Sequence, residues 1–163
     1  DLLIVLYGLD PGPNIALRDA LRALSPADLA AARARAQGRN PAYSADPRDQ
    51  ATPEAMVELL ARLFHAEGVS ETARATLLPI MGRTSTGRHR LEGRLPPGVA
   101  VANKTGSAAG TTNDVGIVTL PNGQAVAMAA YVKDSALPPA EREMVIADIG
   151  RLAYDVMLIA SNT

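Results

Sequence analysis

Apolar residues recur at helical spacing in residues 15–24 and 53–67, and residues 26–37 are rich in Ala. Each of these stretches, and also residues 71–81, follows a residue whose side chain can cap a helix. We therefore predict helices over residues 15–24, 26–37, 53–67 and 71–81, capped by Asn14, Ser25, Thr52 and Ser70. Residues 38–53 hold three prolines and no periodicity, which predicts a long irregular loop of the kind that is usually functional.

The last third of the chain favours strands. Short β-rich runs cover residues 99–104, 114–120 and 124–132, and the Asn122-Gly123 pair between the last two is a strong hairpin signal. Residues 82–97 are rich in Gly, Arg and Pro, so we expect them to be irregular.

Pro138-Pro139 opens a long closing helix, which we expect to pack on the sheet. Five apolar residues follow its helical register: Val145, Ile149, Leu152, Val156 and Ile159. The predicted fold class is α/β (α+β), an antiparallel sheet flanked by helices. A helical part spans residues 1–82, and a sheet part spans residues 83–163.

Composition narrows the functions that such a fold can perform. The 163 residues carry a formal net charge of −1 at pH 7, which argues against nucleic acid as a partner because that needs a basic face. The chain has no Cys and two His, so we expect no metal and no cofactor. No apolar run approaches the roughly 20 residues of a membrane span.

The candidate chemistry lies in the run Lys104-Thr105-Gly106-Ser107, at the end of the first predicted strand. The 16 basic residues are 14 Arg and two Lys, so Lys at this position stands out. An ammonium and a hydroxyl beside a Gly can bind an anionic substrate close to the backbone, and strand N–H groups can stabilise an oxyanion. The alternative is an ordinary strand end with a solvated Lys.

Residues 84–107, followed by residues 112–123, resemble the C-terminal part of class A serine β-lactamases. They are most similar to the branch with Thr-Gly-x-x-Arg-Leu before Lys-Thr-Gly. Arg48-Asp-Gln-Ala-Thr-Pro53 resembles the end of that family's omega loop, and residues 1–8 resemble the helix that follows its Ser-Asp-Asn motif. The resemblance implies a serine β-lactamase/penicillin-binding-like fold, incomplete in this chain.

The resemblance also implies roles for individual residues. Lys104 and Thr105 would bind the substrate carboxylate, with Gly106 beside them in the substrate-binding strand. The backbone N–H of Ser107 would be one of two oxyanion-hole donors. Arg90 would supply a second cation for the carboxylate, and the alternative for Arg90 is a solvated loop cation.

Within the omega-like loop 38–53, the resemblance gives Asn40 the task of holding a hydrolytic water. Asp49 would close the loop by pairing with Arg33 or Arg35, and the alternative is that Asp49 caps the next turn.

The family's water-activating Glu is missing. Its position is occupied by Ala36, and residues 1–53 contain no Glu. Asp28 and Asp46 are the nearby carboxylates that remain. The second step of the reaction, hydrolysis of the acyl-enzyme, would then be slow or use another base.

The resemblance implies a hydrolase that is acylated by β-lactam antibiotics and then releases them. Two alternatives stay open: a penicillin-binding or D,D-peptidase-like protein acting on a peptidoglycan-like substrate, and a non-catalytic β-lactamase-like protein. The chain contains no Ser followed three residues later by Lys, and it begins as if in mid-helix. We therefore expect the nucleophile on a missing N-terminal segment of the same protein, no activity in this chain alone, and a periplasmic or secreted location.

Overall fold

The computed structural model describes residues 6–9, 15–48 and 50–161, and the chain forms two compact units. The first unit comprises Asp1–Gln50, Ser107–Thr111 and Lys133–Leu137, and the second comprises Ala51–Gly106, Thr112–Val132 and Pro138–Thr163. Across the part of the chain that the structure describes, no helix is both long and apolar enough to cross a membrane.

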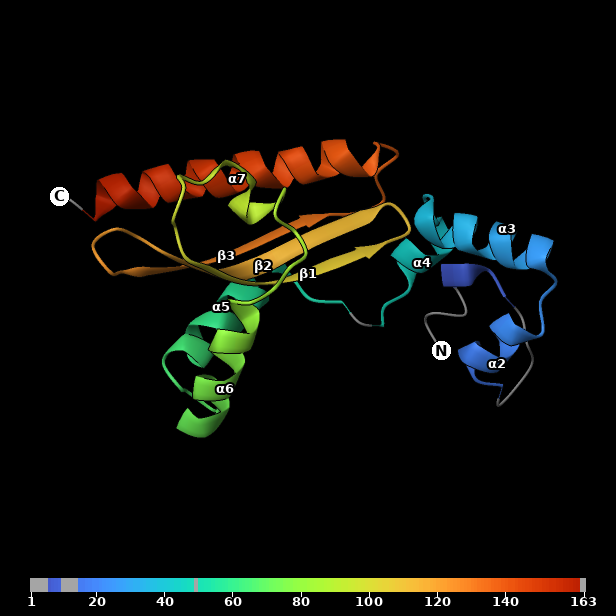
Figure 1. Cartoon of the computed structure of the whole chain (residues 1–163), viewed down its shortest axis with the longest axis horizontal. Helices are drawn as coiled ribbons and strands as arrows, with labels where there is room; N and C mark the ends of the chain where they lie inside the picture. The colour runs from blue at the N-terminus through green and yellow to red at the C-terminus, as the bar shows by residue number, and fades with distance from the viewer. Residues whose placement is uncertain (1–5, 10–14, 49, 162–163) are drawn as a thin grey trace. The chain divides into compact units, whose positions relative to one another are not determined.

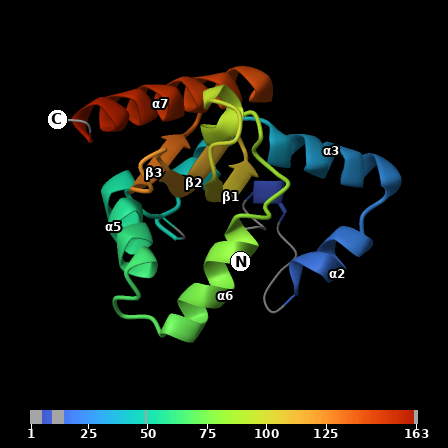
Figure 2. The same ribbon diagram turned by 60° about the vertical axis from the view of Figure 1, so that its left-hand side comes forward.

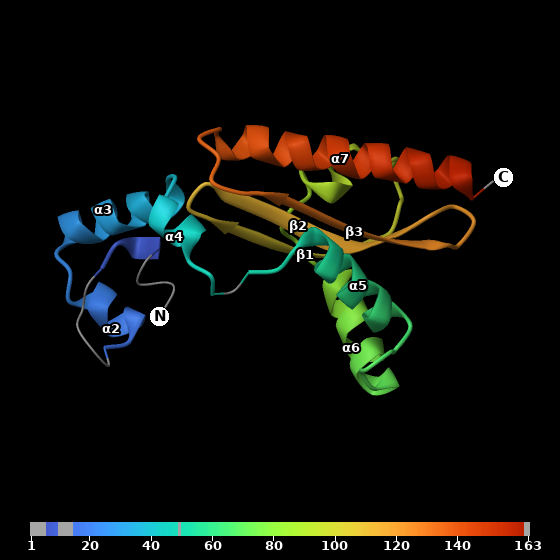
Figure 3. The same ribbon diagram turned by 180° about the vertical axis from the view of Figure 1, so that it is seen from behind.

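The second unit is built on a three-stranded sheet with helices on both faces (Figure 1). The strands, in the spatial order β1-β2-β3, are β1 (Val101–Ala108), β2 (Thr111–Thr119) and β3 (Ala125–Val132). Helix α7 (Pro139–Ala160) runs along one face. On the other face α5 (Pro53–Phe64) contacts β3 and is followed by α6 (Glu71–Met81), as the view from behind shows (Figure 3).

The core of the second unit lies between the sheet and α7. β2 and β3 pair antiparallel, and Leu120 N donates to Gln124 O (2.8 Å) across their turn, which confirms the predicted hairpin. The buried core residues are Leu91, Val118, Leu120, Val126, Met128, Ala130, Ile146 and Tyr154. Leu91 opens a short 3₁₀ helix, η1 (Leu91–Arg94), which packs on α7 at Gly150. A Cβ at position 150 would lie 2.8 Å from the Leu91 carbonyl oxygen, so only Gly permits this approach.

The closing helix is confirmed, but the prediction of which of its faces packs on the sheet is wrong. The five predicted packing residues are exposed, from 42% at Val145 to 68% at Ile159. The residues that α7 buries are Arg142, Ile146, Ala147, Gly150 and Tyr154. Because α7 carries apolar residues on both sides, periodicity alone cannot choose between its faces. The buried side of α7 carries small residues, which let η1 approach closely, and this close packing determines which face is buried.

Three predicted helix starts are confirmed. The side-chain oxygens of Ser25, Thr52 and Ser70 each accept the N–H three residues ahead, at the starts of α3 (Pro26–Gln37), α5 and α6. Helix α5 ends at Phe64 rather than at residue 67. Helix α2 (Leu17–Arg22) begins after Ala16, which makes no side-chain cap, and Asn14 lies outside the described residues. Figure 2 shows α2 and α3.

Two predicted boundaries are corrected. The supposedly irregular loop 38–53 contains a short helix, α4 (Pro41–Ala45), because Asn40 caps it. Strand β1 extends to Ala108, so the Lys-Thr-Gly run lies inside a strand instead of at its end. The strand continues until the left-handed turn at Ala109 and Gly110 (φ 44° and 78°) reverses the chain. Residues 82–97 are irregular apart from η1.

Candidate active site

Lys104, Thr105 and Gly106 lie on β1, the strand at one edge of the sheet. The Lys104 side chain is exposed, and its ammonium donates a hydrogen bond to the Thr105 carbonyl oxygen. Ser107 follows on the same strand and is also exposed. An edge strand offers backbone N–H and C=O groups to a ligand, so an extended substrate can align along β1 beside the Lys104 ammonium.

The segment before η1 is fastened to β1 by side-chain hydroxyls. Thr84 Oγ1 donates to Asn103 O (2.8 Å), and Thr86 Oγ1 lies 2.8 Å from Thr105 Oγ1. Directly after Thr86 the backbone of Gly87 takes a left-handed conformation (φ 79°), and a Cβ there would collide with Thr105 Cγ2. Gly87 is therefore required for this segment to lie against the Thr105 side chain.

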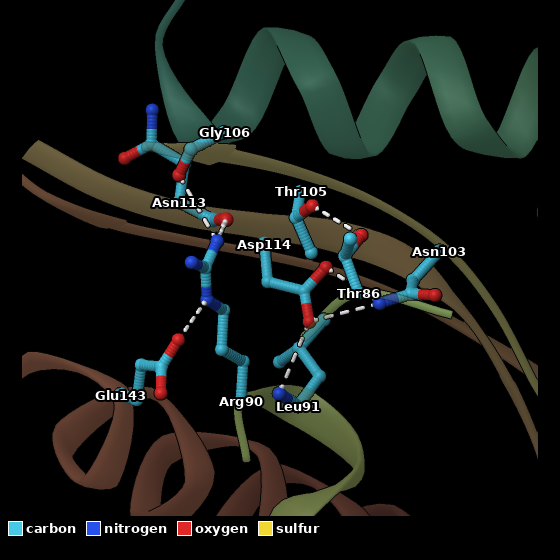
Figure 4. A network of polar contacts seen from close by, with 9 residues as sticks. All are labelled: Thr86, Arg90, Leu91, Asn103, Thr105, Gly106, Asn113, Asp114 and Glu143. Carbon is cyan, nitrogen blue, oxygen red and sulfur yellow. Dashed lines mark hydrogen bonds and ion pairs between the residues drawn. The ribbon is translucent and has the colours of Figure 1, made fainter. Parts of the chain in front are cut away.

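Arg90 is buried in the second unit, which rules out a solvated loop cation. Its Nε donates to Glu143 Oε1 on α7 (3.0 Å), and its Nη1 donates to Gly106 O (3.0 Å) and Asn113 O (2.8 Å). Figure 4 shows the guanidinium reaching from just before η1 toward Gly106, with Glu143 on its other side. The Arg90 guanidinium thus bonds the backbone of the strand that carries Lys104, at Gly106, while the Lys104 ammonium bonds the carbonyl oxygen of Thr105.

A second polar group lies beside Arg90. The Asp114 side chain on β2 is fully buried, and Asn103 Nδ2 donates to both of its carboxylate oxygens (2.9 and 3.1 Å). Leu91 N also donates to Asp114 Oδ2 (3.2 Å). Burial raises the pKa of Asp114 to about 6, although these hydrogen bonds and the Arg90 charge pull it down.

Asn40 and Ala36 lie in the first unit. Asn40 Oδ1 accepts from Tyr43 N (3.0 Å), and its Nδ2 donates to Leu6 O (3.3 Å). The side chain therefore acts as a helix cap in this structure. Ala36 lies in the last turn of α3, where its carbonyl oxygen accepts from Ala109 N (2.9 Å).

The carboxylates that remain near Ala36 in the sequence are already paired. Asp46 accepts from Arg48 Nε (2.8 Å), and hydrogen bonding to Arg48 lowers the pKa of Asp46 to about 2. Asp28 accepts from the Ser25 hydroxyl (2.7 Å) at the start of α3. A carboxylate with so low a pKa is a weak general base, so Asp46 is poorly suited to activate water. Asp49 lies outside the described residues.

Sequence reasoning missed Asn103, Asp114 and Glu143. Glu143 sits 53 residues from Arg90, and only the fold brings them together. Asp114 gives a clearer sequence signal: it alternates with Thr112 and Gly116 on the inward face of β2, where a carboxylate is rare. An acidic residue at an inward strand position predicts a buried polar partner.

Residues 6–9, 15–48 and 50–161 contain no group of three or more His, Cys, Asp or Glu placed to hold a metal ion. The exposed Lys104 ammonium on β1 is a group that can bind an anion.

Residues 11–157 match the family model described as the β-lactamase enzyme family. The extended-spectrum β-lactamase PER-1 of Pseudomonas aeruginosa is 39% identical over 107 residues, which are 62% of this chain and 35% of PER-1.

Solved structures of similar proteins agree with these sequence matches. The TLA-1 extended-spectrum β-lactamase is 41% identical with a TM-score of 0.63, covering 66% of this chain and 41% of its own. A variant of the last common ancestor of Gram-negative bacteria β-lactamase class A is 30% identical with a TM-score of 0.67, covering 86% and 58%. The chain spans less than two thirds of the length of each relative.

Proposed function

Because the chain belongs to the β-lactamase enzyme family, we propose that its protein is a serine β-lactamase-type hydrolase that β-lactam antibiotics acylate. The observation that carries the proposal is the exposed Lys104 ammonium on β1, an edge strand. The buried Arg90 guanidinium adds positive charge nearby, since it donates to the Gly106 carbonyl oxygen of the same strand (3.0 Å). A carboxylate is a substrate group that an exposed ammonium recognises.

We assign the substrate carboxylate to Lys104 and Thr105, with Arg90 as the second cation. Gly106 has no side chain to block the ligand, so the substrate can lie against the backbone. The N–H of Ser107, next on β1, is the proposed oxyanion donor, because it can stabilise the charge that develops on the β-lactam carbonyl oxygen.

The acylation step requires a serine outside this chain. Its oxygen adds to the β-lactam carbonyl carbon, the ring C–N bond breaks, and the ring nitrogen takes up the serine proton. Water then attacks the resulting ester and frees the serine. Asn40 is the proposed ligand of that water. With Ala36 in place of a carboxylate and Asp46 held at a low pKa, we expect this second step to be slow.

A further segment of the same protein is the proposed partner of α7. The exposed apolar residues of this helix include Met144, Val145, Ile149, Leu152 and Val156. This exposed apolar surface favours a covering segment that supplies apolar side chains. A protein acting on β-lactams or peptidoglycan-like substrates belongs in the periplasm or outside the cell, and we propose that location.

PER-1 and TLA-1, to which the chain is similar, are named β-lactamases, which favours a hydrolase over the two alternatives. A chromogenic cephalosporin separates the three possibilities. The proposed hydrolase gives a burst of colour equal to the enzyme concentration, followed by slow turnover in the complete protein. A burst with no turnover identifies a penicillin-binding protein, and no burst identifies a non-catalytic one. The 163-residue chain alone should give no burst.

A further inference from the structure

One buried carboxylate joins the two backbone segments that carry the cations. Asp114 lies opposite Ala130 in the β2–β3 register and is fully buried. Its Oδ2 accepts a hydrogen bond from Leu91 N (3.2 Å). Both of its oxygens also accept hydrogen bonds from Asn103 Nδ2 (2.9 and 3.1 Å). Figure 4 shows the Asp114 carboxylate between β1 and the start of η1.

The two groups that Asp114 holds are the immediate neighbours of the two cations. Asn103 precedes Lys104 on β1, and Leu91 follows Arg90. The loop that leads to Arg90 also passes close by, since a Cβ at Gly87 would lie 3.5 Å from Asp114 Oδ2. A shift of the Asp114 side chain therefore acts directly on the Leu91 backbone beside Arg90, and it acts on β1 beside Lys104 through the Asn103 side chain.

We propose that Asp114 is a positioning residue for substrate recognition, which sets the spacing between the Lys104 ammonium and the Arg90 guanidinium. The inference rests on the proposed function, because the ligand is the β-lactam carboxylate. Asp114 itself contacts no substrate; it acts through Asn103 and Leu91.

Among the described residues, the hydrogen-bond partners of the Asp114 carboxylate are donors. Asn103 Nδ2, Leu91 N and Val115 N all favour its charged form, and Arg90 is the charged group that acts on it. Once protonated, the carboxyl presents an O–H to these donors, so at least one hydrogen bond is lost. Because burial raises the pKa of Asp114 to about 6, the positioning should weaken as the pH falls through about 6.

Three variants of the complete protein test this role. Asp114→Asn keeps the shape but places an amide N–H₂ against Asn103 Nδ2. The swap N103D/D114N restores an amide–carboxylate pair in reverse order and keeps the Leu91 bond, because the amide oxygen at position 114 accepts it. Val118→Ala, also fully buried on β2, is the control for lost stability.

The first readout is the second-order rate constant of acylation by a penicillin, followed by mass spectrometry between pH 5 and 8. The wild type should lose acylation rate below about pH 6, and Asp114→Asn should be about tenfold slower at pH 7, with no inflection near pH 6. The swap should regain most of that loss, and Val118→Ala should stay within about twofold with an unchanged profile. Equal rates and profiles in wild type and Asp114→Asn would overturn the role of Asp114.

The second readout needs no substrate, so it separates this inference from the proposed function. The Leu91 amide proton resonance should titrate with a midpoint near pH 6 in the wild type and stay constant in Asp114→Asn. A Leu91 amide resonance that does not change with pH would overturn the positioning role of Asp114 even if acylation is normal. A titrating Leu91 without acylation of the wild type overturns the proposed function, and with it the recognition role.

Discussion

The ion pair between Arg90 and Glu143 should contribute more to the stability of the folded protein than any other described salt bridge of α7. Arg90 Nε lies 3.0 Å from Glu143 Oε1, and the two side chains are only 9% and 25% exposed. Two unit charges about 4 Å apart attract by at most about 4 kcal/mol at an effective dielectric constant of 20. Glu143→Gln keeps an oxygen acceptor for Nε, and Arg90 keeps its two carbonyl partners, so about half of that value should be lost.

We therefore expect Glu143→Gln to lower the free energy of unfolding by about 2 kcal/mol, which corresponds to a Tm decrease of roughly 4–8 °C for a chain of this size. Urea or thermal denaturation followed by circular dichroism measures it. The same helix offers a matched control, since Arg94 and Asp148 form a pair at 2.8 Å with 54% and 59% exposure. Asp148→Asn should cost less than about 0.5 kcal/mol. Equal losses in the two variants would refute the argument that burial of the Arg90 pair sets its contribution.

Three further substitutions follow from the site. Lys104→Ala should slow acylation by about 10²-fold or more, while Lys133→Ala leaves it unchanged; rapid-quench mass spectrometry compares them, and equal effects would contradict the site. Ala36→Glu should speed release of the acyl group by about 10²–10⁴-fold, seen as faster colour after the burst, and an unchanged release rate would show that position 36 cannot reach the water. Gly87→Ala should destabilise the protein by about 2 kcal/mol in urea denaturation, because its φ is 79° and its Cβ would meet Thr105 Cγ2; a stability equal to wild type would mean that the segment moves freely.

Local signals predicted the elements that depend on neighbouring residues. Ser25, Thr52 and Ser70 start helices because a side-chain oxygen bonds an N–H three residues away, and both partners are visible in the sequence. The hairpin at Asn122-Gly123 is equally local. Local signals were insufficient in the loop 38–53. Asn40 caps α4 by the same rule, but the prolines of this segment led us to predict an irregular loop instead of the short helix.

The packing of α7 and the polar groups around Arg90 depend on distant residues. Val145 and Ile146 are both apolar, yet the structure buries Ile146 and exposes Val145, since the choice depends on η1 and β3. Lys104 and Arg90 are candidates that the sequence offers, and their role in binding stays a prediction. The contacts of Arg90 with Glu143 and of Asp114 with Leu91 depend on the placement of α7 and β2, and no local pattern in the sequence links these partners.

Intact-protein mass spectrometry after mixing the complete protein with a penicillin shows whether β-lactams acylate this protein. One added penicillin mass per protein molecule should form within seconds and persist because deacylation is slow, and it should form far more slowly in Lys104→Ala. A protein mass that stays unchanged, together with penicillin that remains intact, would contradict the assignment of β1, Lys104 and Arg90 to a β-lactam acylation site.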